Sequence, residues 1–200
     1  MQRAQIILAS ASPRRRELLA QIGVEHEVLP VEVDESWRPG EGPPDYVLRL
    51  AEAKARAGWQ RAGGSGQSLP VLAADTTVAL DGEIFGKPRD REAARAMLER
   101  LGGRTHEVYT AVALMHGGGI GTRLSTTHVS LRPMSPAEID WYWSTGEPAD
   151  KAGAYGIQGR AALFVSHIAG SYSGVVGLPL FETWELLGPV LGPSGGGPQS

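Results

Sequence analysis

The residue with the strongest chemical signal is Asp75, a carboxylate in the middle of the apolar segment Val71–Leu80. That segment has the composition of a buried strand, in which a carboxylate is costly unless it is paired, hydrogen-bonded or bound to a metal ion. In a regular strand the side chain of Asp75 lies on one face and that of Thr76 on the other. Metal coordination or general-base catalysis would account for the cost of burial, and a structural carboxylate that accepts backbone N–H bonds is the alternative.

A second group of polar residues lies where a predicted first strand, Ile6–Ala9, leads into a helix. The linking residues 10–16 are Ser-Ala-Ser-Pro-Arg-Arg-Arg. A helix N-terminus offers free backbone N–H groups and positive potential to a phosphate. Arg14 and Arg15 are the better candidates to reach such an anion, because successive helical residues diverge by about 100°. The alternative is an ordinary capped helix with solvated arginines.

Two lysines could add positive charge. Lys54 projects near the apolar stripe of a predicted helix, about Asp45–Trp59, where it either extends to solvent or delivers a point charge to a buried anion. Lys87 follows a predicted hairpin whose turn is Asp81-Gly82. The hairpin would hold Lys87 in a fixed loop. Like Lys54, it either extends to solvent or places a point charge on an anion.

The segment Gly146–Gly159 combines four glycines with polar residues that suit a nucleotide. Glycine allows a ligand to approach the backbone closely. Asp150 and Lys151 could pair with each other or face a phosphate and its metal ion. Gln158 carries both a donor and an acceptor, which suits the edge of a base. The segment matches neither the Walker A pattern nor the dinucleotide fingerprint, and a surface loop with glycines at its turns is the alternative.

Composition excludes several classes of protein. The 200 residues include no cysteine, which rules out disulfides, thiolate nucleophiles and cysteine-based zinc sites. A net charge of -3 gives no basic footprint for duplex nucleic acid or for an anionic membrane. The first apolar run, Ile6–Leu8, is too short for a signal peptide, and no apolar stretch could span a bilayer. We therefore expect a cytoplasmic protein whose partners include neither nucleic acid nor a membrane.

The elements that would position these residues are strands and helices in alternation. Further strands are predicted at about His26–Val31, Glu83–Phe85, Glu107–Met115, Arg123–Arg132 and Leu163–Ile168, and helices after Ser12, after Asp90, at Ser135–Trp143 and at Leu180–Leu187. Ser12, Asp90 and Ser135 are the predicted N-caps. Strand–helix units mixed with hairpins favour an α/β fold with a mixed sheet. The tail 192–200, rich in Gly, Pro and Ser, is predicted to be disordered.

Taken in order, these segments resemble the Maf (septum formation inhibitor) proteins. The resemblance rests on Leu8–Arg15, Ala73–Thr76, Gly86–Pro88, Gly103–His106, Asp150–Gly159, Gly170–Tyr172 and Val175–Leu180. Each motif is modest alone, but the ordered set is highly specific. It implies an elongated mixed β-sheet flanked by helices, a fold of the Maf/Ham1 type related to the ITPases. Residues 1–191 would form a single catalytic domain, with two lobes around a central cleft.

The resemblance also implies an activity. Maf proteins hydrolyse a nucleoside triphosphate to the monophosphate and pyrophosphate with Mg²⁺ or Mn²⁺, usually as homodimers. Lys151 and the sequence Gly156–Gly159 resemble the branch that prefers dTTP and UTP. Two alternatives remain open. One is a non-catalytic nucleotide-binding regulator of septum formation and cell division, and the other is an enzyme that keeps modified pyrimidine nucleotides out of nucleic acids.

The resemblance assigns roles to individual residues. Asp75 would be the proton acceptor, which activates water for attack at the α-phosphorus either directly or through the cation. Asp75 and Glu35 would hold the cation. Arg14, Thr76 and Gln158 would decide the choice of substrate. Ser10, Arg15, Lys54, Lys87 and Lys151 would bind the phosphates and the rest of the substrate.

Overall fold

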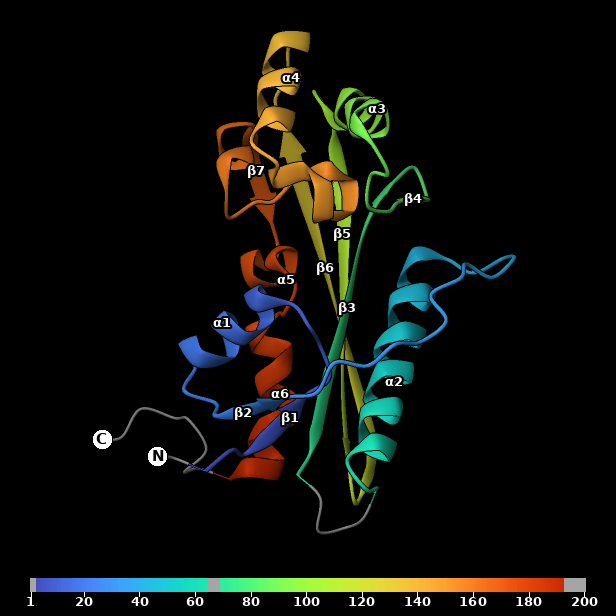
Figure 1. Cartoon of the computed structure of the whole chain (residues 1–200), viewed down its shortest axis with the longest axis vertical. Coiled ribbons are helices and arrows are strands. Elements are labelled where there is room, and N and C mark those ends of the chain that lie inside the picture. Colours follow the sequence, from blue (N-terminus) through green and yellow to red (C-terminus); the bar gives the residue numbers. More distant parts are fainter. Residues whose placement is uncertain (1–2, 65–68, 193–200) are drawn as a thin grey trace.

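The centre of the molecule is a mixed sheet of seven strands that runs along its length (Figure 1). The computed structural model describes residues 3–64 and 69–192. Six strands lie in the order β2 (His26–Val28), β1 (Ile6–Leu8), β3 (Val71–Leu80), β5 (Thr105–His116), β6 (Gly119–Leu131) and β7 (Val165–Ala169), and β4 (Glu83–Phe85) pairs with β3. β1 is parallel to β2 and β3, and the other pairings are antiparallel. The predicted mixed α/β sheet is confirmed.

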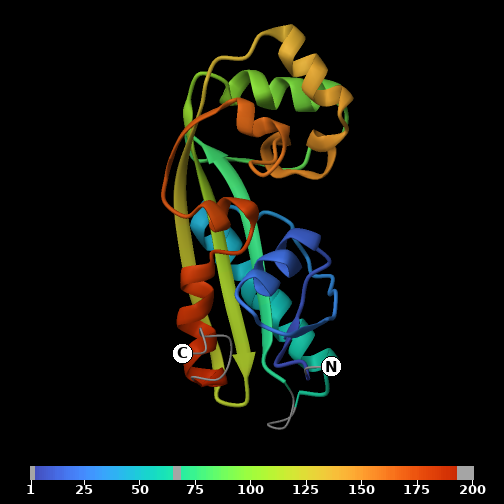
Figure 2. The same cartoon turned by 90° about the vertical axis from the view of Figure 1, so that its left-hand side faces the viewer.

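Helices cover the sheet in two groups (Figure 2). They are α1 (Pro13–Gln21), α2 (Pro43–Arg61), α3 (Arg91–Leu101), α4 (Pro136–Ser144), α5 (Tyr172–Val176) and α6 (Leu180–Leu191), with short 3-10 helices η1 (Glu147–Asp150), η2 (Ala152–Ala154) and η3 (Arg160–Leu163). α3, α4 and the 3-10 helices gather at one end of the sheet, and α1, α2 and α6 gather at the other (Figures 1 and 2). Among the described helices, none is long and apolar enough to cross a membrane.

The alternation of side chains along β3 supplies two cores. Val71 and Ala73 pack with Val47, Ala51 and other apolar residues of α2 on one face of the sheet. Leu72 and Ala74, which alternate with Val71 and Ala73 along β3, point to the opposite face. There the core continues through the helices at both ends of the molecule. Gly58 brings α2 close to the sheet, since a Cβ there would lie 2.8 Å from Val71 Cγ1. β3 is therefore buried on both faces, which explains its apolar composition.

Local signals in the sequence predicted several element boundaries correctly. Asp81 and Gly82 both have positive φ, as a type I′ hairpin turn between β3 and β4 requires. Asp90 caps α3 by accepting a bond from a backbone N–H, and Ser135 forms the expected capping box at the start of α4. Ser12 occupies the N-cap position of α1, but its side chain makes no capping bond.

Other predicted boundaries were wrong. Leu163 ends η3, so the last strand starts at Val165 instead. α2 is longer than predicted, and the short helix α5 was not predicted. α6 continues past the predicted end to Leu191, with Pro189 inside it. Of the tail predicted to be disordered, residues 193–200 lie outside the described part of the chain.

One stretch of β3 has a strand partner on a single side. β1 pairs with β3 only at Val71 and Leu72, and β4 pairs with it only from Val78 onward. Between them, residues 73–77 pair with β5 and, within the described residues, with no other strand. The sheet therefore has an open edge in the middle of a central strand, and Asp75 lies at its centre.

Candidate active site

A cleft of about 800 Å³ opens at this edge of β3, between the two groups of helices. Clefts that bind small molecules commonly have volumes of about 300–1,000 Å³. The structure brings every site residue predicted from the sequence to its wall: Ser10, Arg14, Arg15, Glu35, Lys54, Asp75, Thr76, Lys87, Lys151 and Gln158. These residues come from β1–α1, the loop before α2, α2 itself, β3 and the loops after β4 and α4, so tertiary structure alone unites them.

Asp75 lies at the bottom of the cleft and pairs with a lysine. Its side chain is almost buried, and its Oδ1 lies 2.7 Å from Lys54 Nζ. The same ammonium lies 2.6 Å from Oε1 of Glu35, whose side chain is 57% exposed. Lys54 reaches this position because its side chain is directed from α2 toward the face of β3 that carries Asp75. Lysine in this helix therefore acts as a point charge on a buried anion rather than extending to solvent.

The surroundings of Asp75 change its acidity. Burial raises the pKa of the Asp75 carboxyl above its ordinary value, and the positive charges of Lys54 and Arg15 oppose that rise. A carboxylate with a raised pKa is a stronger base than an ordinary aspartate, and general bases work best with a pKa near the working pH. The site thus holds a carboxylate suited to accept a proton, with two cations that oppose the effect of burial on its pKa.

Arg15 is held by three parts of the chain. Its Nε donates to the carbonyl oxygen of Gly177 at 2.8 Å, Nη1 to Oγ of Ser10 at 3.1 Å and Nη2 to Oγ1 of Thr76 at 3.3 Å. Burial lowers the pKa of the Arg15 guanidinium, and the charge of Asp75 opposes that effect. The bonds give Arg15 a single orientation, so it presents a fixed positive charge to the cleft.

Thr76 projects from the face of β3 opposite to Asp75, as strand alternation predicts. Its hydroxyl accepts a bond from Arg15 and lies 3.0 Å from the hydroxyl oxygen of Thr110 of β5. Both side chains nevertheless line one cleft, because the sheet is open there and the cleft wraps around its edge. Thr110 also lies 2.7 Å from the carbonyl oxygen of Gly174, which ties β5 to α5 behind the site.

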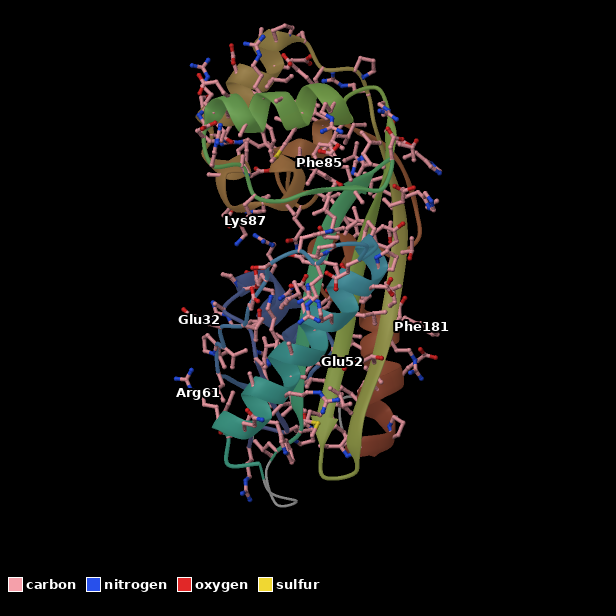
Figure 3. The ribbon with its side chains drawn as sticks, turned by 90° about the vertical axis from the view of Figure 1, so that its right-hand side faces the viewer. Glu32, Glu52, Arg61, Phe85, Lys87 and Phe181 are labelled. Atoms are coloured by element: carbon pink, nitrogen blue, oxygen red, sulfur yellow. The ribbon has the colours of Figure 1, made fainter. Side chains whose placement is uncertain are left out.

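The glycine-rich segment forms the opposite wall of the cleft. Lys151 and Arg14 both form ion pairs with Asp150, and Nη1 of Arg14, from α1, lies 3.8 Å from Oδ2 of Asp150. Lys87 lies between the two groups of helices with an exposed side chain (Figure 3). Gln158 is exposed as well. Arg14, Asp150, Lys151, Lys87 and Gln158 all line the cleft.

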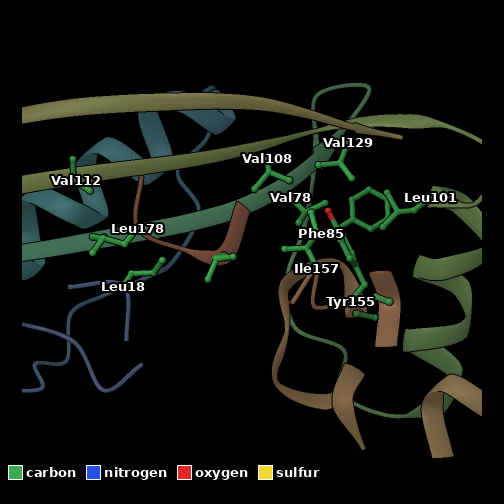
Figure 4. Packing of buried hydrophobic residues seen from close by; sticks show 14 of the residues in the cluster. Leu18, Val78, Phe85, Leu101, Val108, Val112, Val129, Tyr155, Ile157 and Leu178 are labelled. Atoms are coloured by element: carbon green, nitrogen blue, oxygen red, sulfur yellow. The ribbon is translucent and has the colours of Figure 1, made fainter. Parts of the chain in front are cut away.

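Apolar anchors hold this wall against the sheet. Tyr155 and Ile157 are buried and pack toward Val78 and Phe85 (Figure 4). Gly153 donates its N–H to Gly86, and a Cβ on Gly153 would lie 3.1 Å from a methyl group of Val78. The glycine is needed here for close approach, so the position of this wall depends on backbone contact with β3 and the loop after β4.

Asp75 and Glu35 could hold a metal ion only with help from a ligand. Asp75 and Glu35 converge on one atom of Lys54. Within residues 3–64 and 69–192 no group of three or more His, Cys, Asp or Glu side chains is arranged to bind a metal. Mg²⁺ commonly uses one or two carboxylates and takes its other ligands from phosphate oxygens and water. The pair therefore fits a cation that arrives with a phosphate.

Three residues near the cleft were missed as contributors to the site. Tyr46 of α2 lines the cleft and donates to the carbonyl oxygen of Glu35 at 3.0 Å. Tyr142 of α4 and Glu147 of η1 are not among the site residues predicted from the sequence. Both contact the backbone around Gln158. A polar group on a buried aromatic ring was the one available signal, since buried hydroxyls need partners.

A cleft that combines a buried carboxylate, fixed cations and a glycine-rich wall has the chemistry that suits a polyphosphate ligand. The chain belongs to the Maf family: a family model described as "Maf-like protein" matches residues 5–190. A protein of Nitrosomonas europaea named dTTP/UTP pyrophosphatase is 56% identical, over 91% of this chain and 92% of its own. A Bordetella avium protein of the same name is 57% identical, over 92% and 94%.

Among solved structures, the Ham1 protein of Staphylococcus aureus is a more distant match. It has 18% sequence identity to this chain and a TM-score of 0.45, over 63% of this chain and 71% of the other. The family assignment rests on the sequence comparisons alone.

Proposed function

We propose that this chain hydrolyses dTTP and UTP to the nucleoside monophosphate and pyrophosphate, with Asp75 as the group that accepts a proton from water. Membership of the Maf family and the names of relatives more than half identical to it support this activity. The observation that carries the assignment of Asp75 is its position, almost buried at the bottom of the cleft within 2.7 Å of Lys54. A carboxylate is placed there at a cost that a purely structural role does not explain.

In the proposed reaction, Asp75 takes a proton from water as the water oxygen bonds to the α-phosphorus. The bond from that phosphorus to the oxygen bridging to the β-phosphate breaks, and pyrophosphate leaves with the electron pair. Arg15, Lys54 and Lys87 offset the negative charge of the triphosphate and of the leaving group. Ser10 and Lys151 contact the phosphates from the start of α1 and from the glycine-rich wall.

The divalent cation is the second part of the proposal. Asp75 and Glu35 would hold Mg²⁺ or Mn²⁺ together with phosphate oxygens. When bound, the cation would stabilise negative charge on those oxygens and lower the pKa of a bound water. Lys54 pairs with both carboxylates, and we expect its ammonium to turn toward a phosphate when the cation arrives. Replacing Glu35 by Gln should raise the concentration of Mn²⁺ needed for half-maximal activity.

Choice of the base would fall to Arg14, Thr76 and Gln158. All three line the cleft, but they come from three separate segments of the chain. Gln158 offers a donor and an acceptor together, as the N3–H and C4 carbonyl of uracil and thymine require. Cytosine presents the reverse pattern, so a correctly fixed amide would reject it.

The proposal is tested by measuring pyrophosphate release from a panel of nucleotides with Mg²⁺ or Mn²⁺. We expect dTTP and UTP to be turned over fastest, and Asp75→Asn to abolish turnover while keeping nucleotide binding. Asp81→Asn is the matched control, because Asp81 is an exposed carboxylate at the far end of β3 that pairs with Arg104. Wild-type turnover by Asp75→Asn would show that the assignment is wrong.

The same panel addresses the two other functions. Clear binding of nucleotides without release of pyrophosphate from any of them would favour a regulator of septum formation. Faster turnover of 5-methyl-UTP or pseudo-UTP than of UTP would favour removal of modified nucleotides. A homodimer, a cytoplasmic location and a single domain over residues 1–191 stay predictions.

A further inference from the structure

The loop that carries Gln158 is held at two points, one on each side of this residue. The backbone N–H of Gly156 donates to the Tyr142 hydroxyl at 3.1 Å. The backbone N–H of Arg160 donates to Oε2 of Glu147 at 2.9 Å. Gln158 lies midway between the two bonded residues, so its backbone is fixed from both directions.

The two acceptors are themselves joined into one unit. The Tyr142 hydroxyl donates to Oε1 of Glu147 at 2.6 Å. Tyr142 is fully buried, and its ring packs edge-on against Phe164 with the centroids 5.6 Å apart. Burial and the bond to Glu147 raise the pKa of Tyr142, so the hydroxyl keeps the proton that it donates. The buried ring of Tyr142 anchors this unit in the core, and its hydroxyl and the Glu147 carboxylate bind the loop.

The Glu147 carboxylate also packs directly against the backbone of Gly159 in this loop. A Cβ on Gly159 would collide with the carboxylate of Glu147. A further backbone N–H, from Ala161, donates to Oε1 of Glu147 at 3.4 Å. Glu147 thus occupies the space beside Gly159 and binds the free N–H groups at the start of η3, as a capping carboxylate does.

The side chain of Gln158 has no such support. It is exposed, and its amide makes no hydrogen bond to any other residue in the described part of the chain. Its direction in the cleft is therefore set by its backbone alone. An amide distinguishes a C4 carbonyl from a C4 amino group only if it meets the base in one orientation, because its donor and acceptor ends are nearly the same shape.

We propose that Tyr142 and Glu147 form a positioning pair that fixes the loop of Gln158 and thereby gives the site its preference for uracil and thymine over cytosine. The inference rests on the role proposed above for Gln158. The hydrogen bonds from the pair to the loop are all made to backbone N–H groups, so the effect of the pair on base choice is carried by the loop. Tyr142 is not among the residues that line the cleft, whereas Glu147 is, so Tyr142 is the residue that isolates this effect. It would change the choice of base more than the chemical step at Asp75.

The test compares kcat and KM for UTP and CTP in Tyr142→Phe, which removes both bonds of the hydroxyl and keeps the ring. Loss of hydrogen bonds that fix a binding loop should lower the UTP:CTP ratio of kcat/KM about tenfold. We expect most of the loss as a higher KM for UTP, with kcat nearly unchanged. Tyr109→Phe in β5, outside the cleft lining, is the matched control and should keep the wild-type ratio.

Further variants separate this inference from the role of Gln158. Gln158→Ala should lower the same ratio, and Tyr142→Phe should lower it no further when added to Gln158→Ala. If Gln158→Ala keeps the wild-type ratio, the role of Gln158 is wrong, and with it the inference. If Gln158→Ala lowers the ratio and Tyr142→Phe does not, only the positioning pair is wrong. Equal losses for UTP and CTP would also overturn the pair, since they indicate general damage.

A variant that failed to fold would leave the loop untested, so a second one is included. Glu147→Gln keeps the size of a half-buried side chain but replaces one acceptor oxygen by a donor group that faces backbone N–H groups. It should lower the UTP:CTP ratio in the same way as Tyr142→Phe. A wild-type ratio in folded Glu147→Gln would contradict the pair as well.

Discussion

Acid should destabilise this protein through one buried histidine, His106 of β5. Its side chain has no exposed surface, and Nε2 lies 2.8 Å from the Tyr155 hydroxyl. Its Nδ1 has no hydrogen-bond partner among the described residues. Burial lowers the pKa of His106 from 6.5 to about 4. The unfolded chain therefore takes up a proton at a higher pH than the folded chain does.

The size of the effect follows from that difference in pKa. Because the folded pKa is the lower one, the contribution of neutral His106 to stability is complete above pH 6.5 and is lost as the pH falls from there toward 4. Between about pH 7.5 and about pH 5, this residue alone should remove about 2 kcal/mol from the free energy of unfolding. In a chain of this size that is a fall in Tm of roughly 4–8 °C.

The assay is urea unfolding of the wild type and of His106→Gln over this range of pH. Gln is neutral and can still bond to the Tyr155 hydroxyl, so the variant should lose about 2 kcal/mol less than the wild type does on acidification. His128→Gln, at an exposed position on the neighbouring strand, is the control and should follow the wild type. Parallel pH curves for the wild type and His106→Gln would refute the reasoning.

Two further predictions concern Asp75. Lys54→Met removes a charge that lowers the pKa of Asp75, so the acid limb of kcat/KM should move to higher pH, whereas Lys87→Met should lower kcat/KM without moving that limb. Asp75→Asn should raise Tm at neutral pH, because burial raises the pKa of Asp75 and so makes its charged form less stable in the folded than in the unfolded state. That gain should vanish as the pH falls toward the ordinary pKa of aspartate, and an unchanged or lower Tm at neutral pH would contradict it.

Features with local causes were predictable from the sequence. The strand that carries Asp75 has the predicted ends, because a continuous apolar run is bounded by Pro70 and by the Asp81-Gly82 turn. The caps at Asp90 and Ser135 form because a side-chain oxygen next to free backbone N–H groups needs no distant partner. The residues predicted for the site were chosen by their chemistry and by the family motifs, and the structure brings them to one cleft.

Features that depend on distant contacts were not predictable. Ser12 has the right type for a capping residue, yet its N–H bonds to Ser10, whose hydroxyl in turn accepts a bond from Arg15. Arg15 also bonds to Gly177, 162 residues away in sequence. Glu147 binds the backbone 13 residues further on. Such bonds decide which way a polar side chain points, and a pattern of neighbours along the chain contains no information about them.

The open edge of β3 explains why a cleft reaches a strand in the interior of this sheet. The carbonyl oxygen of Leu72 accepts a bond from Ala9 beside β1, so in a regular strand the backbone groups of Ala74 and Thr76 also face that edge. The cleft is therefore lined by backbone groups of β3, by the side chain of Asp75 from one face of the strand and by that of Thr76 from the other. A shift of one residue in the register of β3 would move each side chain to the opposite face of the sheet. The Asp75 carboxylate would then no longer face Lys54. The nine paired positions between β3 and β5 that fix this register are therefore as necessary to the site as its charged residues.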